Sequence, residues 1–418
     1  MKKFYVFLFC AGLFTSQAQT NWQRSVANEN LPDWAGTGNT ERGMAYNSTN
    51  DHVYVVSRIA SNSIRVIDAS DGSDISSIER DASVITGGAF FINDVEVSSD
   101  GSFLVCNLTT DTGASAFKVY KYDDETATPS VYIDFTTSSP ETPLRLGDAF
   151  TVLGDITTDA VIMAAGNGKV VRWVVSAGTL GTPTIITLEE AHGNIMVAHP
   201  LSIDATPEFF VNSAGQPIRK YNADGTFAGE ALSAVGNSST NFKYFEQDSK
   251  EYIAVFQYGA GEIGELATLV DVTGGLGNGT TVNRTPKLGT NGNANGTGDV
   301  GVKTEGTNTT TVFTLSTNNG ISGTTLVQDG VVLNNDEFSL SQTAIFPNPA
   351  SNSFQISLNS NLDQNAELNV LDINGRTVIN TRLESNLQSI SISNLSNGLY
   401  IVKVNNGSNS FTSKLLKK

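Results

Sequence analysis

Short alternating segments of apolar and polar residues dominate the chain, and they fall into six similar groups. Each group consists of a short strand, a polar turn, a nearly continuous apolar strand, a second turn and a third strand that ends near Asp or Gly, as in "GMAYNSTNDHVYVVSRIASNSIRVIDASDG". The alternation and the many β-branched and aromatic residues favour strands, and no stretch keeps the 3.6-residue apolar period of a helix. The pattern therefore predicts an all-β protein. The apolar second strands are predicted to begin near Val53, Phe103, Ala160, Phe209, Tyr252 and Thr311.

The spacing of these groups predicts a β-propeller. Their second strands follow one another at roughly 43 to 59 residues, which suits four-stranded blades joined by loops of variable length. Six groups predict six blades, and a seventh blade within residues 21–40 or 259–295 is the alternative. The segment "NWQRSVANENLPDW" is predicted to supply the outer strand of the last blade and so to close the ring. A glycine- and asparagine-rich segment, 274–298, is predicted to cross flexibly between blades five and six. An array of β-sandwiches is the less favoured architecture.

The stretch "IFPNPASN", residues 345–352, predicts a domain boundary. Proline donates no backbone hydrogen bond and fixes φ, so the stretch continues neither a helix nor a central strand. We therefore assign residues 19–333 to the propeller, 334–344 to a linker and 345–418 to a small β-sandwich. Three "NG" pairs in the last segment are typical of tight hairpin turns.

The first 18 residues have the features of a secretory signal peptide. Lys2 and Lys3 precede an apolar run, and the small residues Ser16 and Ala18 predict cleavage between Ala18 and Gln19. Cys106 is then the one remaining cysteine, so the mature chain forms no internal disulfide, and its apolar surroundings in "FLVCNL" predict a core residue. No other stretch approaches the ~20 apolar residues of a transmembrane helix.

The charge is unevenly distributed along the chain. The formal net charge is −17, yet residues from Ile345 onward include four acidic and six basic side chains, so the acidity belongs to the propeller. An acidic surface repels phosphate backbones and anionic lipid headgroups. Nucleic acid and membrane surfaces are therefore not expected as partners.

The C-terminal segment carries motifs that identify a family resemblance. "FPNPAS", "LNVLDINGRTV", "LSNGLYIVKV" and the basic end "SKLLKK" resemble the type A C-terminal sorting domain of the Bacteroidota type IX secretion system. The resemblance implies export through the periplasm, recognition by the outer-membrane translocon, and release or attachment at the outer cell surface. The residues that match its motifs are Phe346, Pro347, Asn348, Pro349, Gly375, Gly398, Tyr400 and Lys414.

The propeller segment resembles secreted Bacteroidota propellers of uncharacterised function, and that resemblance implies no activity. Candidate chemistry is therefore sought at the starts of the first strands, which converge at one mouth of the ring. The matched residues there are Arg42, Asp94, Asp148, His199 and Asp299. Oxygen ligands from several blades can surround a hard cation, so Asp94, Asp148 and Asp299 are a candidate Ca²⁺ site. The favoured alternative is that these aspartates accept hydrogen bonds from backbone amides in turns.

Two classes of function are compatible with the propeller. The first, which we favour, is a non-catalytic module that binds an extracellular glycan, a peptide or a surface partner. The second is a secreted hydrolase or lyase whose Asp and His side chains at the mouth act as acid and base. The sequence contains no H-E-x-x-H motif, no G-x-S-x-G motif and no clustered Cys and His, so no catalytic residues and no bound cofactor other than Ca²⁺ are assigned.

Overall fold

The chain divides into two compact units, with the boundary between Val332 and Leu333. The computed structural model describes residues 18–59, 62–138, 142–190, 192–193, 195–328, 344–357, 366–373, 375–406 and 409–418. Most of the predicted signal peptide and linker thus lies outside the described residues. In the part of the chain that is described, no helix has the length and apolar character needed to cross a membrane.

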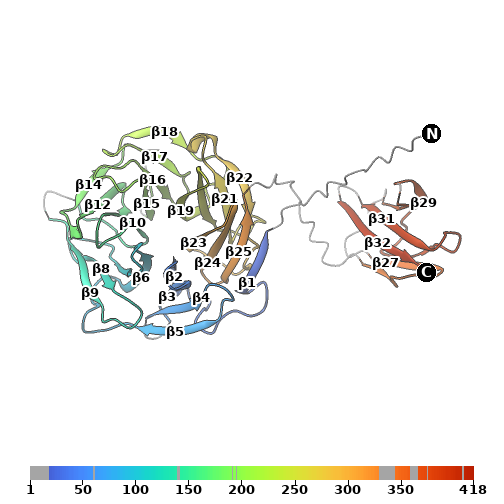
Figure 1. The fold of residues 1–418 in the computed structure, drawn as a ribbon, viewed down its shortest axis with the longest axis horizontal. Helices are drawn as coiled ribbons and strands as arrows, with labels where there is room; N and C mark the ends of the chain where they lie inside the picture. Colours follow the sequence, from blue (N-terminus) through green and yellow to red (C-terminus); the bar gives the residue numbers. More distant parts are fainter. Residues whose placement is uncertain are drawn as a thin grey trace, which may run out of the picture. The chain divides into compact units, whose positions relative to one another are not determined.

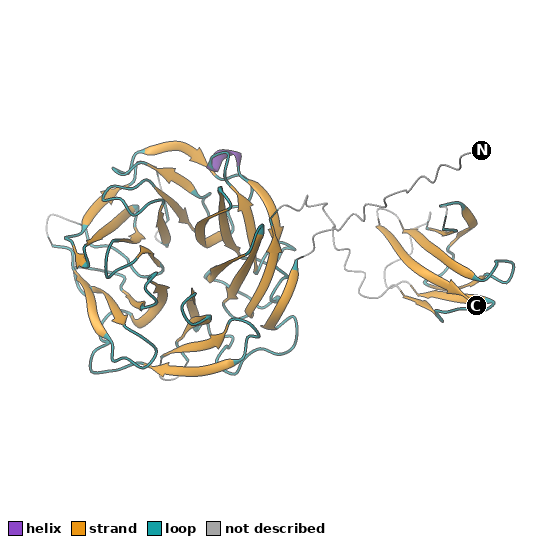
Figure 2. Cartoon of the chain, in the orientation of Figure 1, coloured by secondary structure: helices purple, strands orange, loops and turns teal. Residues whose placement is uncertain are grey.

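The larger unit is a ring of six antiparallel sheets, which confirms the predicted six-bladed propeller (Figure 1). Blades 1 to 5 start at an innermost strand and proceed outward in chain order, blade 6 does so for its first three strands, and strands and loops make up nearly all of the ring (Figure 2). Blade 1 contains β2 (Glu41–Asn47), β3 (His52–Ser57), β4 (Ser63–Asp68) and β5 (Asp74–Glu79). Blade 2 contains β6 (Phe90–Val97), β7 (Phe103–Leu108), β8 (Phe117–Tyr122) and β9 (Ser130–Phe135). Blade 3 contains β10 (Phe150–Gly154), β11 (Ala160–Gly166), β12 (Lys169–Ser176), β13 (Thr179–Leu180) and β14 (Thr184–Thr187).

The remaining three blades follow the same order. Blade 4 contains β15 (Met196–Pro200), β16 (Phe209–Ser213), β17 (Arg219–Tyr221) and β18 (Phe227–Ala231). Blade 5 contains β19 (Ser239–Gln247), β20 (Lys250–Gln257), β21 (Leu266–Asp271) and β22 (Thr280–Arg284). Blade 6 contains β23 (Gly298–Glu305), β24 (Thr309–Ser316), β25 (Gly320–Val327) and the N-terminal strand β1 (Gln19–Ser25).

The ring is closed by β1, as predicted, because this strand pairs antiparallel with β25. Gln19, the first residue after the predicted cleavage site, is the first residue of β1 and lies opposite Thr325. Trp22 on this strand is buried, and its indole N–H donates a hydrogen bond of 2.8 Å to the carbonyl of Ala69 in blade 1. One segment therefore completes blade 6 and fastens it to blade 1.

Two sequence expectations about the ring are corrected. Neither segment proposed for a seventh blade forms one, because residues 21–40 contain most of β1 and residues 259–295 contain β21 and β22. Segment 274–298 is more than a flexible crossing, since it contains the 3-10 helix η1 (Leu276–Asn278) and β22. Val282 on β22 is buried in an apolar cluster of the ring, and this burial accounts for a strand within a glycine-rich sequence.

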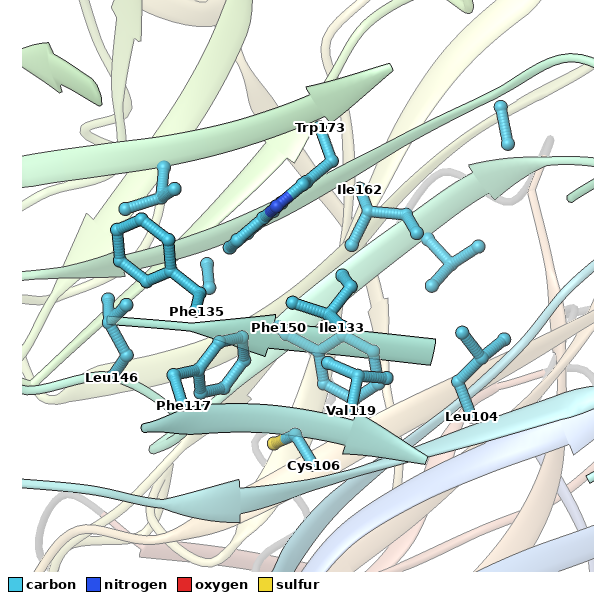
Figure 3. Packing of buried hydrophobic residues seen from close by; sticks show 14 of the residues in the cluster. Leu104, Cys106, Phe117, Val119, Ile133, Phe135, Leu146, Phe150, Ile162 and Trp173 are labelled. Atoms are coloured by element: carbon cyan, nitrogen blue, oxygen red, sulfur yellow. The ribbon is translucent and has the colours of Figure 1, made fainter. Parts of the chain in front are cut away.

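Packing between blades explains why the second strands are apolar along their whole length. On β7, Leu104 and Cys106 face the core shared with blade 3, whereas Phe103 and Val105 face the core shared with blade 1. Successive side chains of a strand point to opposite faces, so a strand between two neighbours must be apolar on both. Figure 3 shows the core between blades 2 and 3, in which Trp173 lies edge-on to an aromatic ring of blade 2. Cys106 is buried there, as predicted.

The C-terminal unit consists of two small antiparallel sheets. One sheet contains β26 (Ala344–Phe346), β27 (Ser353–Ser357) and β30 (Leu387–Ser391). The other contains β28 (Glu367–Leu371), β29 (Thr377–Arg382), β31 (Gly398–Asn406) and β32 (Asn409–Lys417). Phe354 and Tyr400 are buried in one apolar cluster, so the prediction that these aromatic residues form core is confirmed.

Residues of the predicted boundary motif contact the end of the chain. The Asn348 side chain donates to the carbonyl of Lys414 (2.6 Å) and accepts from the amide of Leu416 (2.9 Å). Ala350 forms backbone hydrogen bonds with the same strand, β32. The first motif of the C-terminal unit, which contains Asn348 and Ala350, is therefore hydrogen-bonded to the last motif, at the end of the chain. Gly375 has φ +78°, a left-handed conformation that favours glycine in the turn between β28 and β29.

Candidate functional site

Four charged side chains of the innermost strands form a group that we call the axial cluster. Asp94 and Glu96 come from β6, Lys243 from β19 and Asp299 from β23. The ammonium group of Lys243 donates a hydrogen bond to the Glu96 carboxylate and forms an ion pair with it. β6 belongs to blade 2 and β19 to blade 5, which are opposite each other in a ring of six blades (Figure 1). The ion pair therefore joins opposite sides of the ring.

The two aspartates of the axial cluster connect neighbouring blades. Asp94 accepts a hydrogen bond of 2.8 Å from the backbone amide of Phe150 in blade 3. Asp299 accepts one of 2.8 Å from the amide of Met44 in blade 1. Each aspartate also accepts a hydrogen bond from the amide of the residue that follows it. These contacts correspond to the amide-accepting role that the sequence favoured, with the difference that half of them cross between blades.

Burial dominates the protonation of the axial cluster. It raises the pKa of Asp94 well above its ordinary value, and the negative charges of Asp299 and Glu96 add to this effect. Burial also raises the pKa of Glu96 to about 7, although Lys243 opposes the change. The pKa of Asp299 is raised by burial against the same opposing cation. Three carboxylates thus depend on one ammonium group for compensation of their charge.

The other predicted residues lie apart from this arrangement. The Asp148 carboxylate forms two hydrogen bonds, of 2.5 and 2.6 Å, with the Arg145 guanidinium. His199 on β15 is buried, its Nδ1 lies 2.7 Å from the carbonyl of Pro200, and burial lowers its pKa to about 3, so that it is neutral. Among the described residues, no group of three or more His, Cys, Asp or Glu side chains is arranged to hold a metal ion. The structure brings Asp94 and Asp299 together but does not add Asp148 to them.

A pocket of about 480 Å³ opens near the starts of β2 and β6, and we call it the mouth pocket. Its polar and aromatic lining residues are Asn39, Thr40, Arg42, Arg58, Asn62, Phe90, Phe91 and Asn295. Arg42 was predicted from the sequence, whereas the others were not. They meet because antiparallel strands return to the same face of the ring: β2 and β6 begin there, β3 ends there, and the loop before β23 reaches it.

Arg58 is held firmly in the wall of the mouth pocket. One terminal nitrogen donates to Asn93 Oδ1 (3.1 Å) and the other to the carbonyl of Asn39 (2.9 Å). Its guanidinium carbon lies 3.7 Å from the ring centroid of Phe90, the geometry of a cation–π contact. Its Nε is buried without a hydrogen-bond partner. The side chain is therefore oriented in advance and still has donor capacity.

Arg42 is the less satisfied of the two arginines. It is half-buried, its Nε has no hydrogen-bond partner, and no hydrogen bond from its guanidinium group is found among the described residues. Burial lowers its pKa, an effect that the nearby carboxylates of Asp148 and Glu41 oppose and Arg145 reinforces. Burial and the charge of Arg42 together lower the pKa of Arg58 to about 10. The pocket thus places two partly desolvated cations near each other.

Two phenylalanines at the start of β6 are exposed beside these cations. Phe90 has 43% and Phe91 39% of its surface accessible. Phe91 lies against Arg80, whose guanidinium carbon is 4.1 Å from the ring centroid. Adjacent exposed aromatic residues on a secreted protein are typical of binding surfaces, because their burial in the protein core would otherwise be favourable.

The loops around the mouth pocket are fixed by buried polar side chains. Glu41, which is buried, accepts hydrogen bonds from the Gly36 amide (2.9 Å) and the Thr40 hydroxyl (2.6 Å). Asn318 accepts from the Asn39 amide (2.9 Å) and donates to the carbonyl of Gly292 (2.7 Å). The loop before β2 and the loop before β23 are therefore connected through one residue, Asn318.

Comparison with known families identifies the C-terminal unit. A family model described as the secretion system C-terminal sorting domain matches residues 344–418. Residues 344–418 are a type IX secretion sorting domain. The sorting domain directs the protein out of the cell or to its outer surface and is handled by the secretion machinery, so the predicted location outside the cell or at its outer surface is confirmed.

The propeller is similar to a domain of unknown function and, at low sequence identity, to several solved structures. A second family model, a domain of unknown function (DUF8500), matches residues 69–197, from the end of blade 1 into β15. A DUF4623 family protein from Bacteroides eggerthii is 17% identical with a TM-score of 0.57, over 72% of this chain and 73% of that one. An α-L-arabinofuranosidase from Fusarium graminearum is 9% identical with a TM-score of 0.47, over 75% and 98% of the respective chains. A search of curated proteins found no match. At these identities the similarity shows the fold alone.

Proposed function

We propose that the exported propeller is a non-catalytic binding module whose extracellular ligand docks in the mouth pocket. The observation that carries this proposal is the pair of exposed phenylalanines, Phe90 and Phe91, beside the guanidinium groups of Arg42 and Arg58 in a pocket of about 480 Å³. The aromatic faces supply apolar contact area, and the guanidinium and asparagine side chains supply donors that fix the orientation of a polar ligand.

The same lining supports binding over hydrolysis. An acid–base mechanism requires titratable groups within hydrogen-bond reach of the scissile bond. The described lining residues of the mouth pocket include neither a carboxylate nor a histidine. The buried carboxylates of the axial cluster form hydrogen bonds and ion pairs within the ring. The hydrolase or lyase alternative therefore lacks a specific supporting contact at this pocket.

The proposal is tested with the mature full-length protein on an array of extracellular polysaccharides and peptides. The Phe90→Ala/Phe91→Ala variant should lose binding to every array member that the unmodified protein retains. Ile75→Ala/Val131→Ala is the matched control, because these side chains are 45% and 46% exposed on the outer strands β5 and β9. Equal binding by the unmodified protein and the phenylalanine variant would overturn the assignment of the pocket.

A further inference from the structure

Arginine side chains gather at the mouth pocket, where the carboxylates of Glu41 and Asp148 are also near Arg42. The chain has a net charge of −17, yet Arg42, Arg58 and Arg80 lie around the pocket and Arg145 is close to Arg42. Arg145 is already bound by Asp148, and Arg80 donates to the carbonyl of Ile85 (2.8 Å). Arg58 donates hydrogen bonds from both terminal nitrogens, so Arg42 is the arginine of the pocket that remains available to an incoming group.

The free donors of these two arginines identify the charge of the missing partner. Nε of Arg42 and Nε of Arg58 are both buried without a hydrogen-bond partner, and a buried unsatisfied donor costs stability. A guanidinium group presents its donors as a planar fork that matches two oxygens of a carboxylate or a sulfate. An anion in the pocket would accept hydrogen bonds from the terminal nitrogens of Arg42, whose Nε is itself too buried for a ligand to reach, and it would relieve the repulsion between the two cations.

The remaining lining indicates a sugar as the carrier of that anion. Phe90 and Phe91 expose ring surface on which the C–H face of a pyranose can stack, since each ring is an apolar plane at the edge of the pocket. Asn62 and Asn295 add amide groups that both donate and accept, as hydroxyl groups require. A long polyanion would be repelled by the acidic ring, so recognition must be local and limited to a short stretch of ligand.

We propose that the mouth pocket selects an anionic sugar residue of an extracellular polysaccharide, either a uronate or a sulfated sugar. Arg42 and Arg58 hold the anionic group, and Phe90 with Phe91 holds the sugar ring. This inference rests on the proposed function, because it assumes that the mouth pocket is the binding site. Its new content is the charge of the ligand and the role of Arg42 as the residue that determines specificity.

The experiment is calorimetric titration of the mature full-length protein with matched oligosaccharides. Oligogalacturonate is compared with its methyl ester, and a sulfated galactan oligosaccharide with its desulfated form, so that each pair differs only in charge. We expect one charged member to bind at least about tenfold more tightly than its neutral partner, a difference of about 1.4 kcal/mol. The pair in which the charged member binds more tightly shows whether the ligand is a uronate or a sulfated sugar.

The variants separate charge recognition from ring stacking. Arg42→Gln should remove most of the preference for the charged oligosaccharide, because Arg42 forms no hydrogen bond that the described fold requires. Arg42→Lys should restore the preference only in part, since an ammonium group lacks the planar fork. Phe91→Ala should weaken binding of the charged and the neutral member by a similar factor, because Phe91 lies against Arg80 and not against the two arginines that hold the anionic group. Arg284→Gln on β22 is the matched control and should leave both affinities unchanged, and melting curves verify that each variant is folded.

The two proposals fail in different ways. Equal affinity for charged and neutral oligosaccharides, with loss of affinity on Phe91→Ala, would overturn the anionic preference and retain the binding site. Unchanged affinities in both Arg42→Gln and Phe91→Ala would overturn the site as well. Tighter binding of a polyglutamate peptide than of any oligosaccharide, or no binding of any charged oligosaccharide, would overturn the assignment of a sugar.

Discussion

The ion pair of Lys243 in the axial cluster gives the most direct test of how the ring is held together. Lys243 is the cation that compensates Asp94, Glu96 and Asp299, all of which are buried. Lys243→Met keeps most of the side-chain volume and removes the charge. Removing one partner of a buried ion pair costs about 3–5 kcal/mol, because the other charge is left without compensation. The folded propeller of about 300 residues has an unfolding entropy of ~0.6 kcal/mol/K, so the expected loss is about 5–8 °C in Tm.

The loss of stability in Lys243→Met should depend on pH in a defined direction. The folded pKa of Glu96, about 7, lies above its ordinary value of 4.5, so the folded protein binds more protons than the unfolded chain between these limits. The free energy of unfolding therefore falls as pH rises through that window. The pKa values of Asp94 and Asp299 are raised as well, so these residues act in the same direction. At pH 5, below the pKa of Glu96, less buried negative charge is left without compensation in the variant, so the loss of stability relative to the unmodified protein should be smaller than at pH 8.

The assay is chemical unfolding followed by intrinsic fluorescence at pH 8 and pH 5. Lys303→Met is the control, because Lys303 also lies on an innermost strand but forms a partly exposed ion pair of 2.8 Å with Asp51. An exposed pair of this kind contributes about 0–1 kcal/mol. If Lys243→Met lost no more stability than Lys303→Met at pH 8, or lost the same amount at both pH values, the reasoning about the buried carboxylates would be wrong.

Three further predictions concern close packing, ring closure and export. Gly43→Ala should destabilise the ring by more than about 2 kcal/mol, because the new Cβ would lie 1.8 Å from Asp94 Oδ1 and 2.5 Å from Asp94 Cα. Gly36→Ala is the control: its new Cβ would lie 3.5 Å from the nearest atom, and the variant should be nearly neutral in the same unfolding assay. Trp22→Ala should cost about 3–5 kcal/mol and lower the Tm in calorimetry, since it empties a buried site between blades 6 and 1; an unchanged Tm would contradict closure by β1. Deleting residues 346–418 should retain the propeller in the periplasm, which cell fractionation measures, and normal appearance of the shortened protein outside the cell would contradict the sorting role.

The repeating fold could be predicted in detail from the sequence. The predicted second strands near Val53, Phe103 and Ala160 correspond to β3, β7 and β11, and the N-terminal segment forms the closing strand. These features are readable because each blade is built from strands that are neighbours in sequence, and its alternation of side chains is set by strand geometry alone. The sorting domain is readable for a similar reason, since its motifs are contiguous stretches of sequence.

The candidate site was only partly predictable. The starts of the innermost strands indicated Arg42, Asp94 and Asp299 as candidate residues. They did not indicate that Arg42 lines a pocket whereas Asp94 and Asp299 belong to a buried cluster. The doublet Phe90–Phe91 was a usable signal, because two adjacent aromatic residues at the start of an innermost strand break the alternation that buries one face. Arg58 could have been placed beside it by noting that β3 ends where β2 begins.

By itself the sequence determined the blades, the order in which they close and the route of export. Only the tertiary structure decided which charged side chains meet. Lys243 and Glu96 are 147 positions apart, and Arg58 is 32 positions from Phe90 on another blade. Local periodicity specifies which face of a strand is apolar, but it carries no information on the rotation of one blade against the next. Contacts across the axis and between blades depend on that rotation, and the packing of whole sheets sets it.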